Sequence, residues 1–246
     1  MPVLRVSGLS FSYGERPLFS ELSFELRPGD FMCVLGPNGC GKSTLLKLLT
    51  GYIRAASGSV RLGGEEVSAL RPGRLARLAA YVASETSVPY DFSVMETVLL
   101  GRTARAGLWR GYSEEDGRAA GLALRETGMA ALAARSINTL SSGERQLAFI
   151  AQALAQETRL LLLDEPTSHL DLRYKEEVMG LLRRLAAKGL AVAAVLHEPG
   201  VARLGCTKTL TAGGGGKWNF GPAAELLKPE RLAGVYGVPP DSPLLA

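Results

Sequence analysis

A glycine-rich loop between an apolar run and a helical segment constrains the fold of this chain more than any other feature. Residues 36–44 fit the pattern G-x-x-x-x-G-K-[ST], a loop that cradles nucleotide phosphates. Its glycines let successive backbone N–H groups point into one concavity, at which the next helix directs the positive end of its dipole. The residues expected to contact the nucleotide are Gly36, Pro37, Asn38, Gly39, Cys40, Gly41, Lys42, Ser43 and Thr44.

The segments on either side of the loop support this interpretation. Residues 31–35 are all apolar, as in a buried strand, and residues 42–49 have apolar residues at helical spacing before Gly51. In a strand–loop–helix unit, the Lys42 ammonium reaches the β- and γ-phosphates and the Ser43 hydroxyl ligates Mg²⁺. The competing interpretation is an ordinary glycine-rich turn, which the companion motifs below disfavour.

The composition is that of a soluble globular protein, with 46% hydrophobic and 21% charged residues. A length of 246 residues suffices for one large α/β domain, or for a domain that carries a subdomain. The net charge of +4 is mild, so nucleic acid is not expected as a partner. No apolar run has membrane-spanning length, no signal-peptide pattern opens the chain, and the three cysteines lack metal-type spacing, which together favour a cytoplasmic protein.

Strand-like and helix-like segments alternate along most of the chain. This alternation predicts parallel strands joined by right-handed crossovers, with a long helical block inserted among them. Capping boxes at residues 113–116 and 141–144 mark two helix starts in that block. We expect strands at 3–6, 22–26, 60–62, 80–83, 160–163 and 190–196, helical structure over 94–154 and 175–188, a hairpin at 207–221, and a short helical tail from 222.

A second acidic site follows the apolar run at residues 160–163. Asp164 and Glu165 stand where this strand ends, the edge at which open α/β sheets bind ligands. Asp164 suits a Mg²⁺ shell, and Glu165 suits the orientation or deprotonation of an attacking water. His197 follows the next apolar strand and can donate a hydrogen bond to a γ-phosphate. The competing interpretation is a buried strand ending in an acidic turn, beside a structural histidine.

Residues 140–146 read LSSGERQ and resemble LSGGE-x-Q, the signature of ATP-binding subunits of ABC transporters. The resemblance covers roughly residues 3–239 and implies an α/β fold: a P-loop NTPase (RecA-like) core, an N-terminal antiparallel β part and an inserted α-helical subdomain. We expect one domain over 1–239, with its core at 1–87 and 155–221 and its insertion at 88–154, and a tail over 222–246. The family also implies a head-to-tail dimer of two copies that sandwiches two ATP molecules, each facing a partner's Ser141, Ser142, Gly143 and Glu144.

The resemblance assigns roles to further residues. It implies ATP and Mg²⁺ as cofactors, Glu165, His197 and Lys42 as catalytic residues, and Tyr13 as the aromatic ring that stacks on adenine, although a strand-edge tyrosine is an alternative. Residues 168–171 correspond to the loop that crosses the dimer interface.

Two positions depart from the family pattern. Ser84 stands where a metal-contacting glutamine is usual, which puts coupling or turnover in doubt, and Ser142 replaces the usual first glycine of the signature.

Similarities that are less specific than the nucleotide-binding motifs point to the importers of iron–siderophores, haem or cobalamin. They lie in residues 165–172, in residues 99–102 and in the tail from Gly221 to Pro239. The resemblance implies a peripheral protein on the cytoplasmic face of the cell membrane, with an integral membrane permease docked around residues 84–105 and, indirectly, a periplasmic or lipid-anchored binding protein. The alternatives are a soluble ABC-type ATPase not coupled to transport, a binding-only regulator, and an importer of another cargo such as an oxyanion.

Overall fold

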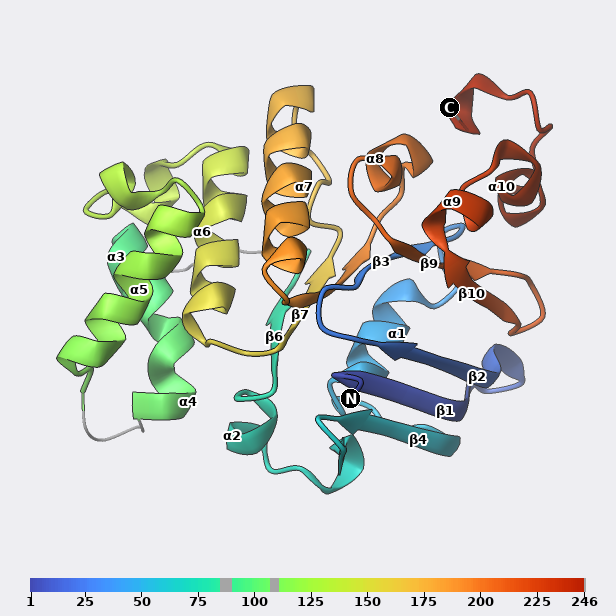
Figure 1. The fold of residues 1–246 in the computed structure, drawn as a ribbon, viewed down its shortest axis with the longest axis horizontal. Helices are drawn as coiled ribbons and strands as arrows, with labels where there is room; N and C mark the ends of the chain where they lie inside the picture. The colour runs from blue at the N-terminus through green and yellow to red at the C-terminus, as the bar shows by residue number, and fades with distance from the viewer. Residues whose placement is uncertain (85–89, 107–110, 246) are drawn as a thin grey trace.

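The computed structural model describes residues 1–84, 90–106 and 111–245, which form two β-sheets and a group of helices (Figure 1). The larger sheet has six strands, of which all but the edge strand β10 run parallel. Parallel pairing and the hairpin at 207–221 were both expected from the sequence and are confirmed. In spatial order the strands are β10 (Trp218–Pro222), β9 (Lys208–Ala212), β3 (Phe31–Leu35), β8 (Ala191–Val195), β7 (Leu160–Asp164) and β6 (Ala79–Val82).

The smaller sheet is antiparallel and is built mostly from the N-terminal segment. Its first two strands are longer than the predicted 3–6 and 22–26. The pairing of these strands continues past Val6 through register shifts, in a segment where serines alternate with apolar residues. The strands, in spatial order, are β2 (Arg16–Leu26), β1 (Leu4–Tyr13), β4 (Ser57–Leu62) and β5 (Glu65–Glu66). The mixed α/β fold with an antiparallel N-terminal part is therefore confirmed.

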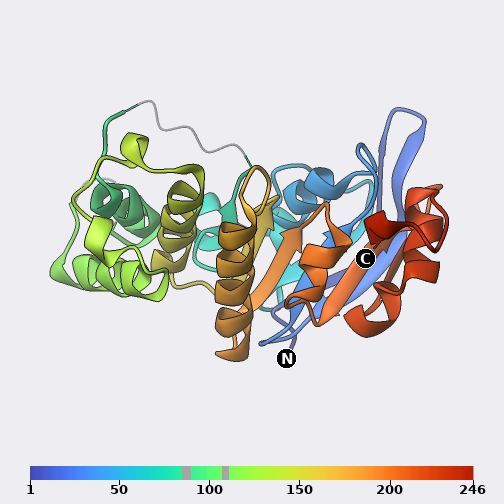
Figure 2. The same cartoon turned by 90° about the horizontal axis from the view of Figure 1, so that it is seen from above.

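Helices cover both faces of the parallel sheet. Helix α1 (Lys42–Leu49) fills the space between the two sheets, whereas α7 (Leu172–Ala187) lies over the opposite face (Figure 2). Side chains of the all-apolar strands alternate between two cores: Met32 packs with α1, and Cys33 packs toward α7. Helix α7 begins three residues earlier than predicted because the Asp171 carboxylate caps it, accepting the Tyr174 N–H at 2.9 Å.

Most of the remaining helices lie between β6 and β7 in the chain or after β10, whereas α8 lies between β8 and β9. Both predicted capping boxes are present, at Ser113 with Asp116 and at Ser141 with Glu144. The boundary of the insertion at residues 88–154 stays a prediction. Within the described residues, no helix has the length and apolarity that a bilayer span needs. The helices other than α1 and α7 are α3 (Val94–Leu99), α4 (Thr103–Ala106), α5 (Glu114–Glu126), α6 (Ser142–Ala155), α8 (Pro199–Arg203), α9 (Ala223–Leu226) and α10 (Pro229–Tyr236). The single-turn helix α2 (Pro72–Leu75) precedes β6.

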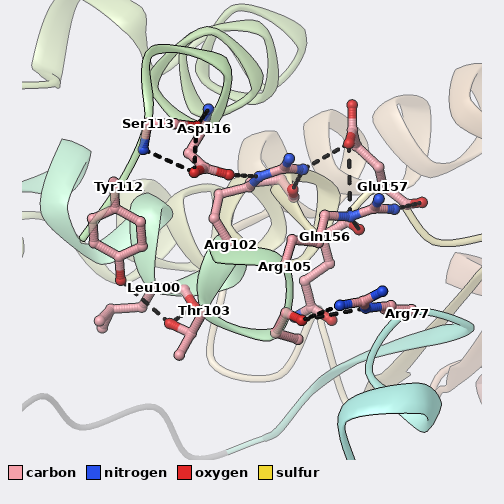
Figure 3. Close-up of polar contacts among 12 residues, drawn as sticks. Arg77, Leu100, Arg102, Thr103, Arg105, Tyr112, Ser113, Asp116, Gln156 and Glu157 are labelled. Carbon is pink, nitrogen blue, oxygen red and sulfur yellow. Dashed lines mark hydrogen bonds and ion pairs between the residues drawn. The ribbon is translucent and has the colours of Figure 1, made fainter. Parts of the chain in front are cut away.

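A buried arginine joins the inserted helices to the strand that follows them (Figure 3). Arg102 is only 2% exposed, and its guanidinium donates to Asp116 Oδ1 at 2.8 Å, to the Ala155 carbonyl at 2.7 Å and to Glu157 Oε2 at 2.6 Å. The pKa of Asp116 is lowered to about 2, mainly by the Ser113 backbone N–H and then by Arg102. One side chain thus connects α5, the end of α6 and the link into β7.

Candidate functional site

The phosphate loop connects β3 to α1 and encloses a lysine. Gly39 and Gly41 have φ values of 73° and 111°, which only glycine adopts easily, and Gly41 is the N-cap of α1. Lys42 is 7% exposed, and its Nζ donates to the Gly36 carbonyl at 2.7 Å and to the Pro37 carbonyl at 3.2 Å. Two neutral carbonyls leave the ammonium charge uncompensated, so an anion in the concavity would attract it.

A serine hydroxyl and a carboxylate meet beside this loop. Ser43 Oγ, from α1, donates to Asp164 Oδ1 at the end of β7, over 3.2 Å. Burial raises the pKa of Asp164, the neighbouring Glu165 charge adds to the effect, and the hydrogen bond from Ser43 opposes it. A buried carboxylate beside a hydroxyl fits a hard cation such as Mg²⁺, which takes oxygen ligands and stabilises the ionised carboxylate.

A tyrosine that sequence reasoning missed also reaches this carboxylate. The Tyr81 hydroxyl, from β6, donates to Asp164 Oδ2 at 3.3 Å. Burial raises the pKa of Tyr81 to about 12, with the Asp164 charge adding to it, so the phenol remains a donor at neutral pH. Tyr81 pairs with Leu162 in the parallel register and therefore shares a sheet face with Asp164 two residues further on. Its contact with Asp164 depends on the β6–β7 register, which the local sequence does not show.

The expected metal contact Ser84 lies just beyond β6, at the same sheet edge as Asp164. Its side chain is exposed at a bend. Residues 85–89, part of the expected permease groove, lie outside the described residues. The role of Ser84 as a metal ligand therefore stays a prediction.

The candidate catalytic pair is in direct contact. His197 Nε2, after β8, lies 2.5 Å from Glu165 Oε1, and Ser168 Oγ donates to Glu165 Oε2 at 3.0 Å. Burial alone would raise the pKa of Glu165, but hydrogen bonds from His197 and Ser168 outweigh it and hold the pKa below its ordinary value. The carboxylate is therefore ionised at neutral pH and able to accept a proton, with its direction fixed by two partners.

The signature-like residues begin α6 in the helical insertion, apart from α1 and the phosphate loop (Figure 1). Ser141 Oγ accepts the Glu144 N–H at 3.3 Å, and Glu144 Oε2 accepts the Ser141 N–H at 2.9 Å. Ser142 is exposed, whereas Gly143 is buried against α7, where a Cβ would come within 2.2 Å of the Tyr174 ring. Only glycine fits there. One chain does not bring these residues to its own phosphate loop, so their contact with nucleotide stays a prediction.

The candidate adenine-stacking ring lies at the end of β1. Tyr13 is 56% exposed and meets Phe11 edge-on, with ring centroids 5.0 Å apart. Arg16, its cross-strand partner in the β1–β2 hairpin, donates through Nη2 to the Gly39 carbonyl at 3.2 Å. This bond ties the hairpin to the phosphate loop and leaves the Tyr13 ring available to a flat ligand.

Comparison with known proteins gives consistent matches. Residues 19–168 match the family model described as "ABC transporter". The chain is 36% identical to the ferric enterobactin transport ATP-binding protein FepC of Escherichia coli K12, with 96% of this chain and 87% of FepC covered. It is 36% identical to the hemin import ATP-binding protein HmuV of Thermobifida fusca, with 95% and 82% covered.

Two further matches differ in how much of each protein they span. The chain is 40% identical to the uncharacterized ABC transporter ATP-binding protein YvrA of Bacillus subtilis 168, covering 82% of this chain but only 46% of that protein. Among solved structures, a metal-chelate type ABC transporter in an inward-facing conformation superposes with a TM-score of 0.86 at 35% identity, covering 97% of this chain and 90% of that one.

Proposed function

This chain belongs to the ABC transporter ATP-binding family, whose members are ATPases coupled to transport, and we propose that it powers a metal-chelate importer. The proposed cargo is an iron–siderophore or haem, with cobalamin as a further candidate of the same chemical class. The observation that carries the proposal is similarity over 95% or more of the chain to FepC, to HmuV and to a metal-chelate type transporter. Cargo is inferred by analogy, because no residue described above is placed to contact it.

The residues at the sheet edge divide the chemistry of hydrolysis among them. Ser43 and Asp164 would hold Mg²⁺, which, when bound, neutralises charge on the phosphate oxygens. Lys42 would exchange its two carbonyl partners for phosphate oxygens. Glu165 accepts the proton of the attacking water, and the contact with His197 fixes the orientation of the Glu165 carboxylate. The Tyr81 hydroxyl holds the second oxygen of Asp164 and so orients the carboxylate.

A second copy of the chain completes the site. Within one chain the signature residues and the phosphate loop belong to separate regions, so a head-to-tail partner would present the N-terminus of α6, with Ser141, to the bound ATP. The permease would contact the region between residues 84 and 105, on the cytoplasmic face of the membrane, and a periplasmic or lipid-anchored binding protein would deliver the cargo to it.

The serine in place of glutamine gives one testable consequence. We expect Ser84→Gln to change ATP affinity by less than about 2-fold and to raise turnover in the permease complex about 2- to 10-fold, because a longer amide regains one hydrogen bond at the metal side. Titration of nucleotide and ATPase assays of the complex measure the two effects, with Ser84→Ala as the control. A large loss of ATP binding would show that Ser84 does not occupy the glutamine position.

The transport proposal is tested by identifying the membrane partner. Tagged Glu165→Gln protein, loaded with MgATP, is used to isolate complexes from solubilised membranes of the source cell, and the bound proteins are identified by mass spectrometry. We expect a polytopic permease in stoichiometric amount. Recovery of soluble partners alone, or of a bare homodimer, would favour a soluble ABC-type ATPase and contradict the proposal.

A further inference from the structure

A cavity of about 670 Å³ lies at the edge of the parallel sheet opposite to the nucleotide site. Its lining includes Arg77, Arg159 and Gly189, which stand within two residues of the start of β6, β7 and β8. Because these strands are parallel, the phosphate loop and Asp164 lie at their other ends. Volumes of about 300 to 1,000 Å³ are usual for small-molecule sites, so this cavity has room for a ligand of its own.

Arginines outnumber carboxylates around this cavity. An ion pair between Arg74 and Glu65 balances one guanidinium. Glu157 Oε2 lies 3.8 Å from Arg105 Nε but closer, at 2.6 Å, to the buried Arg102. The other two arginines have no carboxylate within ion-pair distance in the part of the chain that the structure describes. The charged side chains that line the cavity are Glu65, Arg74, Arg77, Arg105, Glu157 and Arg159, an excess of two positive charges.

The two arginines without a carboxylate partner are Arg77 and Arg159. Arg77 donates through Nε and Nη2 to the Ala104 carbonyl at 3.3 and 3.2 Å, which leaves its Nη1 group unused (Figure 3). The Arg159 side chain has no hydrogen bond to any described residue. A carbonyl orients a guanidinium without neutralising it, and the planar N–H donors that remain match the oxygens of a phosphate group.

The same cavity lies where the inserted helices meet the sheet. Arg105, in α4, donates to the Gln156 and Glu157 carbonyls at 3.1 Å each, and its Nη1 group is also unused (Figure 3). Arg77 and Arg159 belong instead to the segments that lead into β6 and β7. Guanidiniums from both parts of the fold therefore line one space and keep donors for a ligand.

We propose that this cavity binds a small phosphate monoester, whose oxygens accept hydrogen bonds from Arg77, Arg105 and Arg159. A phosphate monoester carries a charge of about −1.5 to −2 at pH 7, which balances the two guanidiniums that lack a carboxylate. The bound anion joins α4 to the segments before β6 and β7 and so restrains the inserted helices relative to the sheet. This site is separate from the phosphate loop and goes beyond the proposed function.

Titration calorimetry with glycerol 3-phosphate, a phosphate monoester, tests the site. We expect Arg159→Gln to raise the Kd at least about 10-fold, because the variant loses a charge-assisted hydrogen bond to the anion. The melting temperature without ligand should not change, since the Arg159 side chain has no other partner. Arg118→Gln makes the same change of charge at a 69% exposed side chain outside the cavity, and this control should keep the wild-type Kd.

A further variant separates this cavity from the phosphate loop, which also attracts phosphate. Lys42→Ala should change the Kd for glycerol 3-phosphate by less than about 2-fold. A Kd that rises in Lys42→Ala and stays unchanged in Arg159→Gln would place the anion in the phosphate loop and overturn the proposal. Amide hydrogen exchange in α4 should slow when the ester is bound, and exchange that is unchanged would overturn the restraint of the inserted helices.

The phosphate monoester has two sources, a free metabolite or a lipid headgroup. Sedimentation with phosphatidylcholine vesicles that contain phosphatidic acid distinguishes them. Binding of glycerol 3-phosphate in solution, without binding to these vesicles, indicates a free ester. Sedimentation that requires both phosphatidic acid and Arg159 indicates a lipid headgroup. Absence of Arg159-dependent binding in both experiments would overturn the proposal.

Discussion

Glu165→Gln should reduce ATP hydrolysis at least about 100-fold while ATP binding is retained, because general-base catalysis contributes about 10²- to 10⁴-fold. Glutamine keeps the size of the side chain but cannot accept the proton of the attacking water. The His197 contact at 2.5 Å and the Ser168 hydrogen bond orient this carboxylate and lower its pKa, so the wild-type base is ionised at neutral pH. Steady-state phosphate release and nucleotide titration on the purified protein measure the two effects.

The same variant should accumulate as an ATP-bound dimer, visible in size-exclusion chromatography with MgATP. Glu177→Gln is the matched control, since Glu177 is an exposed carboxylate on α7 and its replacement should leave hydrolysis unchanged. A hydrolysis rate in Glu165→Gln equal to that of this control would show that Glu165 is not the base.

Arg102→Met should destabilise the protein by about 3–5 kcal/mol, the usual cost of removing one partner of a buried ion pair. Methionine has no charge to offer Asp116, which is 5% exposed, and no donor for the Ala155 carbonyl, which accepts from the guanidinium at 2.7 Å. Part of the lost free energy of unfolding should come from weaker attachment of the helical insertion to β7. Urea unfolding followed by circular dichroism gives the free-energy difference between the variant and the wild type.

Two further variants make this result specific. Arg118→Met removes an arginine that is 69% exposed, pairs with exposed Glu114 and should cost less than about 1 kcal/mol. Adding Asp116→Asn to Arg102→Met should recover part of the loss, because the buried carboxylate no longer lacks a countercharge. A loss in Arg102→Met no larger than in Arg118→Met would contradict the role of Arg102 as a buried connector.

Local sequence patterns were sufficient to locate the phosphate loop, the acidic pair and two helix starts. The loop glycines, the capping boxes at Ser113 and Ser141, and the acidic pair after β7 each depend on residues within a few positions of one another. In the structure the two carboxylates point in different directions, Asp164 toward Ser43 and Glu165 toward His197. Glu165 achieves this with a φ of 53°, a left-handed conformation that no local pattern indicated.

Contacts between distant segments were not predictable from such patterns. Tyr81 reaches Asp164 across 83 positions through the β6–β7 register, and Arg102 reaches Ala155 and Glu157 through the packing of the insertion. Each depends on how elements pack in three dimensions, whereas propensity and spacing act over one turn or one strand.

ATP-driven uptake in proteoliposomes tests the central claim most directly. The chain is reconstituted with the permease recovered from its membranes, and accumulation of an iron–siderophore, haem or cobalamin is followed with ATP supplied on the side of this protein. The account predicts ATP-dependent accumulation of one of these metal chelates with wild-type protein and none with Glu165→Gln. ATP hydrolysis by the wild-type complex without transport of any of the three would contradict it.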